Sequence, residues 1–313
     1  MKPDLSTGLG PLRLTNPVIL AAGTCGWGLE LASYLPLDRL GALTTKSLTL
    51  EPWPGNSPPR LAETPAGMLN AVGLQNPGVD YFVTRVWPEL KRYSVPVIAS
   101  IGGRSADEYA AVARRLNRAA EGLAALEINI SCPNVKAGGL AFGSHPDTAA
   151  SVVEAVRRET SLPLLVKLAP MTADPVGVAR AVVAAGADAL TVANTIPGMA
   201  IDIEKRRPRL GNTVGGLSGP AVRPVILRLV WEIAGALPET PIVGLGGIFT
   251  AEDALEYLLA GARALGIGTA TLVNPRAAIE VLEGLTEYCR THNISRLADL
   301  VGAARGQHPE GHP

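Results

Sequence analysis

Short apolar runs recur along the whole chain and alternate with amphipathic stretches. Eight runs read as strands: 17–22, 42–48, 95–101, 125–131, 162–169, 189–195, 241–247 and 264–270. Most are apolar at nearly every position, as expected of parallel strands that are covered on both faces. The pattern therefore predicts eight buried parallel strands.

Amphipathic stretches of helical length lie between most of these runs: 79–93, 106–121, 146–160, 174–185, 221–237 and 252–261. The last one follows Thr250, whose hydroxyl precedes two carboxylates, a pattern typical of a helix start. About eight repeats of strand and helix predict an α/β fold, a (β/α)8 TIM barrel. An open doubly wound sheet is the alternative, and the absence of a composition break argues against it.

The domain organisation follows from the same pattern. No linker interrupts the 313 residues, so we predict a single domain over 1–313 in which 304–313 form a frayed tail. Two connections are unusually long, 49–77 after the second strand and 196–220 after the sixth. Connections of this length commonly carry function.

Charge and hydropathy exclude several classes of protein. The 28 basic and 28 acidic residues cancel, so no uniform field favours nucleic acid or an anionic membrane. The apolar runs are far shorter than the ~20 residues of a spanning helix, and residues 1–14 lack the apolar region of a signal peptide. We expect a soluble cytoplasmic protein that binds neither nucleic acid nor membrane.

Cysteine and histidine spacing gives no sign of a metal. The three cysteines form no CxxC pair and no disulfide framework. The four histidines, His145, His292, His308 and His312, lack ligand spacing, so no metal site is predicted. We interpret Cys25 and Cys289 as structural.

Polar residues stand at the ends of all eight predicted strands, and in a TIM barrel these ends converge on one face. They are Ala22-Gly23-Thr24, Lys46-Ser47, Ser100, Asn129 with Ser131-Cys132, Lys167, Asn194-Thr195, Gly246-Gly247 and Gly268-Thr269. Any one of them reads as an ordinary turn residue, but together they predict a single site.

Two features of this set suggest an anionic ligand. Gly246-Gly247 and Gly268-Thr269 precede helices at the strands where barrels bind phosphate, although a glycine pair also permits tight packing. Lys46 and Lys167 lie in apolar strands, where an ammonium needs an anionic partner. That partner is the ligand, or Glu127, which shares a strand face with Asn129, or both.

Cys132 follows the fourth strand directly, within Asn129-Ile130-Ser131-Cys132-Pro133-Asn134. A free cysteine is usually an inert core residue. Here the amides of Asn70, Asn129, Asn134 and Asn194 offer paired donors and acceptors that suit a flat heterocyclic amide or imide.

Several motifs carry a family resemblance: KSLT at 46–49, ETPAGMLNAVGLQNPG at 63–78, NISCPNVKAGG at 129–139, VKLAP at 166–170, ANT at 193–195 and GGLSGPA at 215–221. With the late glycine pairs, they resemble the FMN-dependent dihydroorotate dehydrogenases of class 1 over nearly the whole barrel. Cysteine in SCPN marks class 1, and the forms of the two longer motifs resemble class 1B, whose members pair with an iron-sulfur flavoprotein and pass electrons to NAD.

The resemblance implies a role for each matching position. Cys132 would be the base that takes the proton from C5 of dihydroorotate, with Lys46 and Lys167 beside it as catalytic residues. One FMN would be held by Ala22, Lys46, Ser47, Ser100, Asn129, Lys167, Ala193, Gly219, Gly246, Gly247, Gly268 and Thr269. The substrate, dihydroorotate or orotate, would be held by Lys46, Asn70, Ala71, Val72, Gly73, Leu74, Asn129, Asn134, Asn194 and Thr195.

The resemblance also implies partners and leaves alternatives. The barrel would form a homodimer, and an iron-sulfur flavoprotein carrying FAD and a 2Fe-2S cluster would complete a heterotetramer. Ala22 and Ser100 depart from the usual serine and asparagine of the family. The alternatives are a fumarate-dependent class 1A enzyme, a tRNA dihydrouridine synthase, which the neutral charge and the chain length disfavour, and a non-catalytic flavin- or phosphate-binding barrel.

Overall fold

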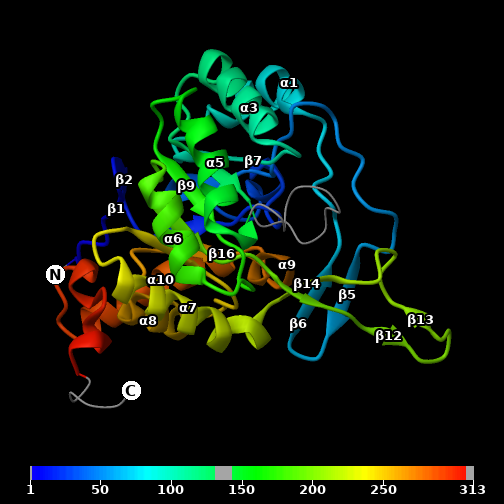
Figure 1. The fold of residues 1–313 in the computed structure, drawn as a ribbon. Coiled ribbons are helices and arrows are strands. Elements are labelled where there is room, and N and C mark those ends of the chain that lie inside the picture. The colour runs from blue at the N-terminus through cyan, green and yellow to red at the C-terminus, as the bar shows by residue number, and fades with distance from the viewer. Residues whose placement is uncertain (1, 131–142, 308–313) are drawn as a thin grey trace.

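A closed barrel of eight parallel strands forms the centre of the molecule (Figure 1). The computed structural model describes residues 2–130 and 143–307. The strands are β3 (Val18–Leu20), β4 (Ala42–Thr44), β7 (Val97–Ile101), β8 (Ala125–Asn129), β9 (Leu164–Lys167), β10 (Ala189–Val192), β15 (Ile242–Leu245) and β16 (Ala264–Ile267). Each lies within one predicted run, and they follow one another around the barrel in chain order. The prediction of a TIM barrel is confirmed.

Helices cover the outside of the barrel (Figure 1). The main ones are α3 (Ala106–Ala119), α5 (Pro146–Arg157), α6 (Pro175–Ala184), α7 (Arg223–Ala236), α8 (Ala251–Ala260) and α10 (Ala277–Thr291). Shorter pieces are α1 (Val79–Tyr81), a π-helical turn η3 (Phe82–Val86), α2 (Trp87–Leu90) and α9 (Ala270–Val273). The predicted cap is present: the Thr250 hydroxyl accepts from the Asp253 amide, and the Asp253 carboxylate accepts from the Thr250 amide.

The barrel interior is apolar toward the N-terminal ends of the strands. Ile19, Ile98, Leu165 and Val243 point inward there and pack in one buried cluster. A hairpin of β1 (Thr7–Leu9) and β2 (Leu12–Leu14) covers this end of the barrel, and its leucines pack in the same cluster. This hairpin was not predicted from the sequence. The barrel is therefore a packed core and not a channel.

The barrel interior is polar toward the C-terminal ends of the strands. Two residues beyond Ile98 and Leu165, on the same inward faces, stand Ser100 and Lys167, and Glu127 and Thr191 occupy the strands beside them. All four are buried. Because side chains alternate along a strand, the inward positions of these neighbouring strands change from apolar to polar toward their C-terminal ends, which marks that end as the functional end.

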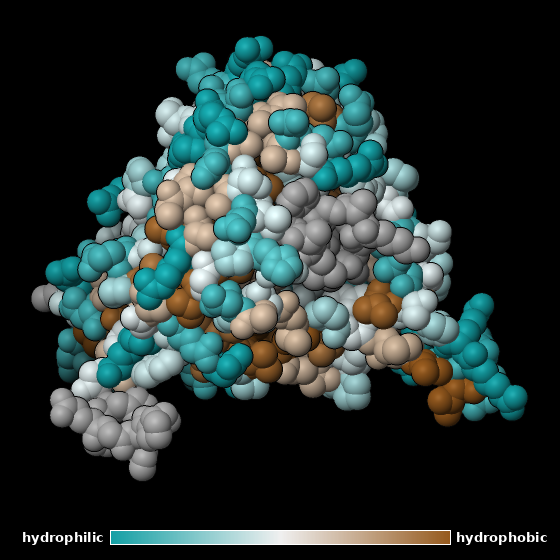
Figure 2. Space-filling model, in the orientation of Figure 1, coloured by the Kyte–Doolittle hydropathy of each residue, from teal (hydrophilic) through white to brown (hydrophobic). Residues whose placement is uncertain are grey.

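The two long connections meet above this end as a small sheet. Its strands are β5 (Leu61–Thr64), β6 (Gly67–Asn70), β14 (Gly215–Ser218) and β11 (Ile196–Gly198), in the order β11-β14-β6-β5. An arm built on β12 (Ile201–Asp202) and β13 (Arg207–Pro208) projects beside it, at the right of Figure 1. The arm exposes Ile201 and Ile203, and apolar surface is visible there in Figure 2.

The last described residues pack on the barrel. Ala303–Gln307 form a 3-10 helix, η6, and the Arg305 guanidinium lies 4.3 Å from the Trp231 ring centroid and donates to the Trp231 carbonyl oxygen at 2.6 Å. Of the tail expected at 304–313, residues 304–307 are therefore held in place, and 308–313 lie outside the described residues. Within the described ranges, no helix is both long enough and apolar enough to cross a membrane.

Candidate active site

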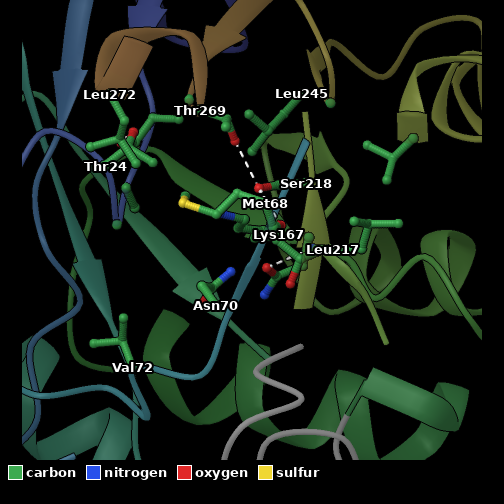
Figure 3. Close-up of a pocket in the computed structure, with 18 of the residues that line it drawn as sticks. Thr24, Met68, Asn70, Val72, Lys167, Leu217, Ser218, Leu245, Thr269 and Leu272 are labelled. Carbon is green, nitrogen blue, oxygen red and sulfur yellow. Dashed lines mark hydrogen bonds between the residues drawn. The ribbon is translucent and has the colours of Figure 1, made fainter. Parts of the chain in front are cut away.

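A cavity of about 270 Å³ opens at the C-terminal end of the barrel, between the strand ends and the small sheet (Figure 3). Every barrel strand except β7 contributes lining residues, directly or through the loop that follows it. Asn70, Met68 and Val72 face this space from β6 and the loop beyond it, opposite Lys167. The predicted convergence of strand ends on one site is seen in the structure.

Most of the predicted site residues line the cavity: Ala22, Lys46, Ser47, Asn70, Val72, Gly73, Leu74, Asn129, Lys167, Ala193, Asn194, Thr195, Gly246, Gly247, Gly268 and Thr269. Ser100, Ala71 and Gly219 do not line it. Cys132 and Asn134 lie outside the described residues, so the structure places neither of them.

Ser100 lies behind the residues that line the cavity. It is fully buried, and its hydroxyl lies 2.9 Å from the Ser47 hydroxyl, to which the Asn129 amide donates at 3.3 Å. The cofactor contact expected of Ser100 stays a prediction. In the structure Ser100 hydrogen-bonds Ser47, which in turn accepts from Asn129, so it helps to orient both of these lining residues.

Ala71 and Gly219 also support other residues. Ala71 is buried and donates its backbone amide to the Arg60 carbonyl at 2.7 Å, which ties the loop after β6 to the strand beside it. Gly219 has a φ of 98°, and its carbonyl oxygen lies where a Cβ on Gly247 would approach to 2.7 Å. Both residues support the backbone beside the cavity, and their expected ligand contacts stay predictions.

The amides form a linked set across the cavity floor. Asn194 Nδ2 donates to Asn129 Oδ1 at 3.4 Å, and Asn194 Oδ1 accepts from the Thr195 backbone amide at 2.8 Å. Asn70 Nδ2 donates to the Gly216 carbonyl at 3.2 Å from the opposite side. Because these bonds fix the planes of three amides, the cavity is organised for a flat polar ligand.

The two lysines provide the positive charge of the site. Lys167 is 6% exposed and lines the cavity. Lys46 is half-buried, and burial lowers the pKa of its ammonium; the Glu30 carboxylate opposes this shift and the Arg60 guanidinium adds to it. Among the residues that the structure describes, neither lysine forms an ion pair, so the expected alternative of a direct pairing with Glu127 is not seen. A buried ammonium that faces a cavity is suited to an anionic or electron-accepting ligand.

The other end of the cavity is lined by backbone. Gly246 and Gly247 have φ values of 157° and 73°, and the Tyr257 hydroxyl, on α8, donates to the Gly246 carbonyl at 2.6 Å. The Thr269 hydroxyl donates to the Ser218 hydroxyl at 2.8 Å, as drawn in Figure 3. Glycine turns beside two hydroxyls, directly before helices, form a cradle of the kind that holds phosphate.

The apolar lining was not predicted. Met68, Leu217, Leu245, Val222 and Leu272 line the cavity, two of them from the small sheet. The sequence does contain apolar residues within both long connections. Only the pairing of β6 with β14, however, brings them together beside the cavity. No group of three or more His, Cys, Asp or Glu side chains suited to a metal occurs within the described part of the chain.

Comparisons with known proteins show the family of the chain. A family model described as dihydroorotate dehydrogenase matches residues 4–288. A protein of Desulforudis audaxviator named dihydroorotate dehydrogenase B (NAD(+)), catalytic subunit, is 55% identical over 304 residues, covering 97% of this chain and 98% of that protein. Proteins of the same name from Trichlorobacter lovleyi and Desulforamulus reducens are each 52% identical, covering 98% and 97% of this chain and 100% and 99% of their own lengths. The resemblance found in the motifs is thereby confirmed, and the chain belongs to the dihydroorotate dehydrogenase family.

Proposed function

We propose that this chain oxidises (S)-dihydroorotate to orotate in pyrimidine biosynthesis, as a cytoplasmic enzyme that uses FMN and, through a partner subunit, NAD. The observation that carries the proposal is the cavity itself, which combines a phosphate cradle, the Lys167 ammonium and three fixed amides. The names of the relatives, which include both the reaction and NAD, support the same assignment.

The residues present fit FMN. Gly246-Gly247 and Gly268-Thr269, where side chains are absent or hydroxyl-bearing, would hold the phosphate, and Ala22, Ser47, Ala193 and Lys167 would hold the ring system. When bound, FMN supplies the acceptor for the two electrons that leave the substrate. Lys167 stabilises the negative charge that this acceptance creates.

The substrate belongs between the ring and the small sheet. Asn70, Asn129 and Asn194 offer amide groups to the pyrimidine edges, and Thr195 and the loop Val72–Leu74 close its sides. Lys46 lies beside Ser47 at the same edge and pairs with the carboxylate of the substrate. Cys132, proposed from the family motif as the base, follows Asn129 closely in the chain but is outside the described residues.

The direct test is the colour of the purified chain. We expect a yellow protein whose flavin absorbance at ~450 nm is bleached anaerobically by dihydroorotate but not by NADPH. Bleaching by NADPH alone would favour a dihydrouridine synthase. Binding of FMN without bleaching by either reductant would favour a non-catalytic barrel.

Gly268→Val tests the placement of the phosphate. A Cβ on Gly268 meets nothing nearer than 3.8 Å, and the three neighbouring atoms belong to Ala21, Leu245 and Thr24, which all line the cavity. The Cβ therefore enters ligand space without a clash in the fold, and the two methyl groups of valine extend further into that space. We expect FMN affinity to fall about tenfold or more, measured by flavin fluorescence on reconstitution, with little change in the melting temperature of the FMN-free chain.

The matched control for this variant is Gly306→Ala. A Cβ at Gly306 meets no atom within 4 Å, and this residue is in η6, far from the cavity in the chain and in the fold. FMN affinity should be unchanged. Equal affinity of Gly268→Val and the unaltered chain would place the phosphate elsewhere.

A further inference from the structure

Glu127 is a buried acid with no part in the chemistry described above. It is 3% exposed on β8, and its Oε2 accepts from the Thr191 hydroxyl at 3.1 Å. Its Oε1 is fully buried and receives no hydrogen bond from the described residues. Buried carboxylate oxygens are nearly always hydrogen-bonded, so a carboxylate that keeps one oxygen without a donor needs an explanation.

The strand register places Glu127 directly under the cationic end of the site. Asn129 and Thr191 are the register partners of Lys167 on its two sides, and Glu127 precedes Asn129 by two residues on the same inward face. Thr191, the hydrogen-bond donor to Glu127, therefore stands beside Lys167. Lys167 lines the cavity, whereas Glu127 does not, so the carboxylate lies one layer below the ammonium.

Glu127 and Lys167 lie in buried surroundings, where a charge acts over a longer distance than it does at the surface. The layer beneath it is the apolar cluster around Ile98 and Leu165. The pKa of the nearby Cys25 thiol is raised to about 12, mainly by burial and then by the Glu30 carboxylate; Glu127 adds to this rise and Lys167 opposes it. A carboxylate in such surroundings acts on its neighbours more strongly than a surface charge does.

We propose that Glu127 is a positioning residue that balances the charge of Lys167 and thereby sets the redox potential of the flavin bound above it. The inference rests on the proposed binding of FMN in this cavity. Glu127 touches neither ligand and makes no direct ion pair with Lys167, so it acts through the electric field of its carboxylate. With both residues ionised the layer beneath the ring is neutral overall, and Lys167 favours the reduced, more negative flavin only in part.

Three variants test the balance of charge. Glu127→Gln keeps the shape of the side chain, can still accept from Thr191 and leaves Lys167 without a counter-charge, so we expect the midpoint potential of the flavin to rise. Lys167→Met should lower it. The double variant restores a neutral layer and should give a potential between those of the two single variants.

The readout is the midpoint potential from an anaerobic titration with a reference dye at fixed pH. For Glu127→Gln we expect a rise equivalent to about a tenfold change in the ratio of the dissociation constants of oxidised and reduced FMN. Glu127→Asp retains the charge and should recover more than half of this change. If Glu127 had a purely structural role, its variants would change the melting temperature of the protein and leave the midpoint potential of the flavin unchanged.

The outcomes separate the inference from the function on which it rests. A chain that binds no FMN would remove the proposed function itself. FMN that binds with the same potential in Glu127→Gln as in the unaltered chain would overturn the inference alone. If Glu127→Gln fails to fold, the comparison of Lys167→Met with the double variant decides instead, because replacing both charges leaves no charge unpaired. Equal potentials in those two proteins would also overturn it.

Discussion

Replacing Cys132 with Ala is expected to slow the reduction of bound FMN by dihydroorotate about 10²–10⁴-fold, the usual cost of losing a general base. Cys132 follows Asn129, whose side chain lies on the cavity floor and is bonded to Ser47 and Asn194. The substrate has no other assigned acceptor for the C5 proton. FMN should stay bound, because the phosphate cradle and Lys167 are on other strands. The measurement is anaerobic stopped-flow absorbance of the flavin.

Two further cysteine variants give this experiment its controls. Cys289 is buried on α10, away from the cavity, so Cys289→Ala should leave the rate of flavin reduction unchanged. Cys132→Ser should retain some activity at higher pH, since a hydroxyl is a far weaker acid than a thiol with an ordinary pKa of about 8.5. Cys25 is no substitute base, because burial raises its pKa to about 12. Flavin reduction at the ordinary rate in Cys132→Ala would exclude the cysteine as base.

The barrel was predictable because its strands are covered on both sides. Runs such as 125–131 and 162–169 are apolar nearly throughout, and each contains a strand of the barrel. The runs overshoot the strand ends, since 42–48 holds a strand only over Ala42–Thr44. The residues of the overshoot, Lys46 and Ser47, are in the loop and line the cavity. Apolar character thus located the strands, and the polar residues at the ends of the runs located the site.

The sheet above the cavity was not predictable by the same reasoning. Its strands are only three or four residues long, and β5 alternates exposed and half-buried positions around Leu61–Thr64. The pairing of β6 with β14 joins Asn70 to Gly216, far apart in the chain, and no local pattern specifies such a register. The position of Ser100 behind the lining was not predictable for a related reason. Its place at the end of β7 follows from the sequence, but only the structure shows that it hydrogen-bonds Ser47 and does not itself line the cavity.

The second prediction with a large expected effect concerns the protein to which the electrons pass. The sequence contains no GxGxxG motif, and three scattered cysteines are too few for an iron-sulfur cluster, which typically takes four. The proposed FMN and substrate sites already use the residues that line the cavity. If NAD is the final acceptor, as in the names of the relatives, the electrons must leave through a second protein. We propose the iron-sulfur flavoprotein subunit, bound to a homodimer of barrels as a heterotetramer.

A surface suited to this partner lies beside the cavity. Helix α9 directly follows Gly268-Thr269 and exposes Leu272 and Val273, with exposed fractions of 51% and 74%. Leu272 also lines the cavity, so a protein seated on α9 reaches the edge of the bound flavin. Two exposed apolar side chains next to an electron-transfer site are consistent with an interface for the partner.

The chain purified alone is therefore expected to reduce artificial dyes with dihydroorotate but not NAD, and to gain NAD reduction when it is co-expressed with the flavoprotein subunit. Val273→Asp should lower the NAD rate of the complex while leaving the dye rate of the isolated chain unchanged. Tyr93→Asp is the matched control, because this exposed residue precedes β7 and lies at the opposite end of the barrel. Robust NAD reduction by the isolated chain would refute the need for a partner. Efficient fumarate reduction would instead assign the chain to the fumarate-dependent class 1A.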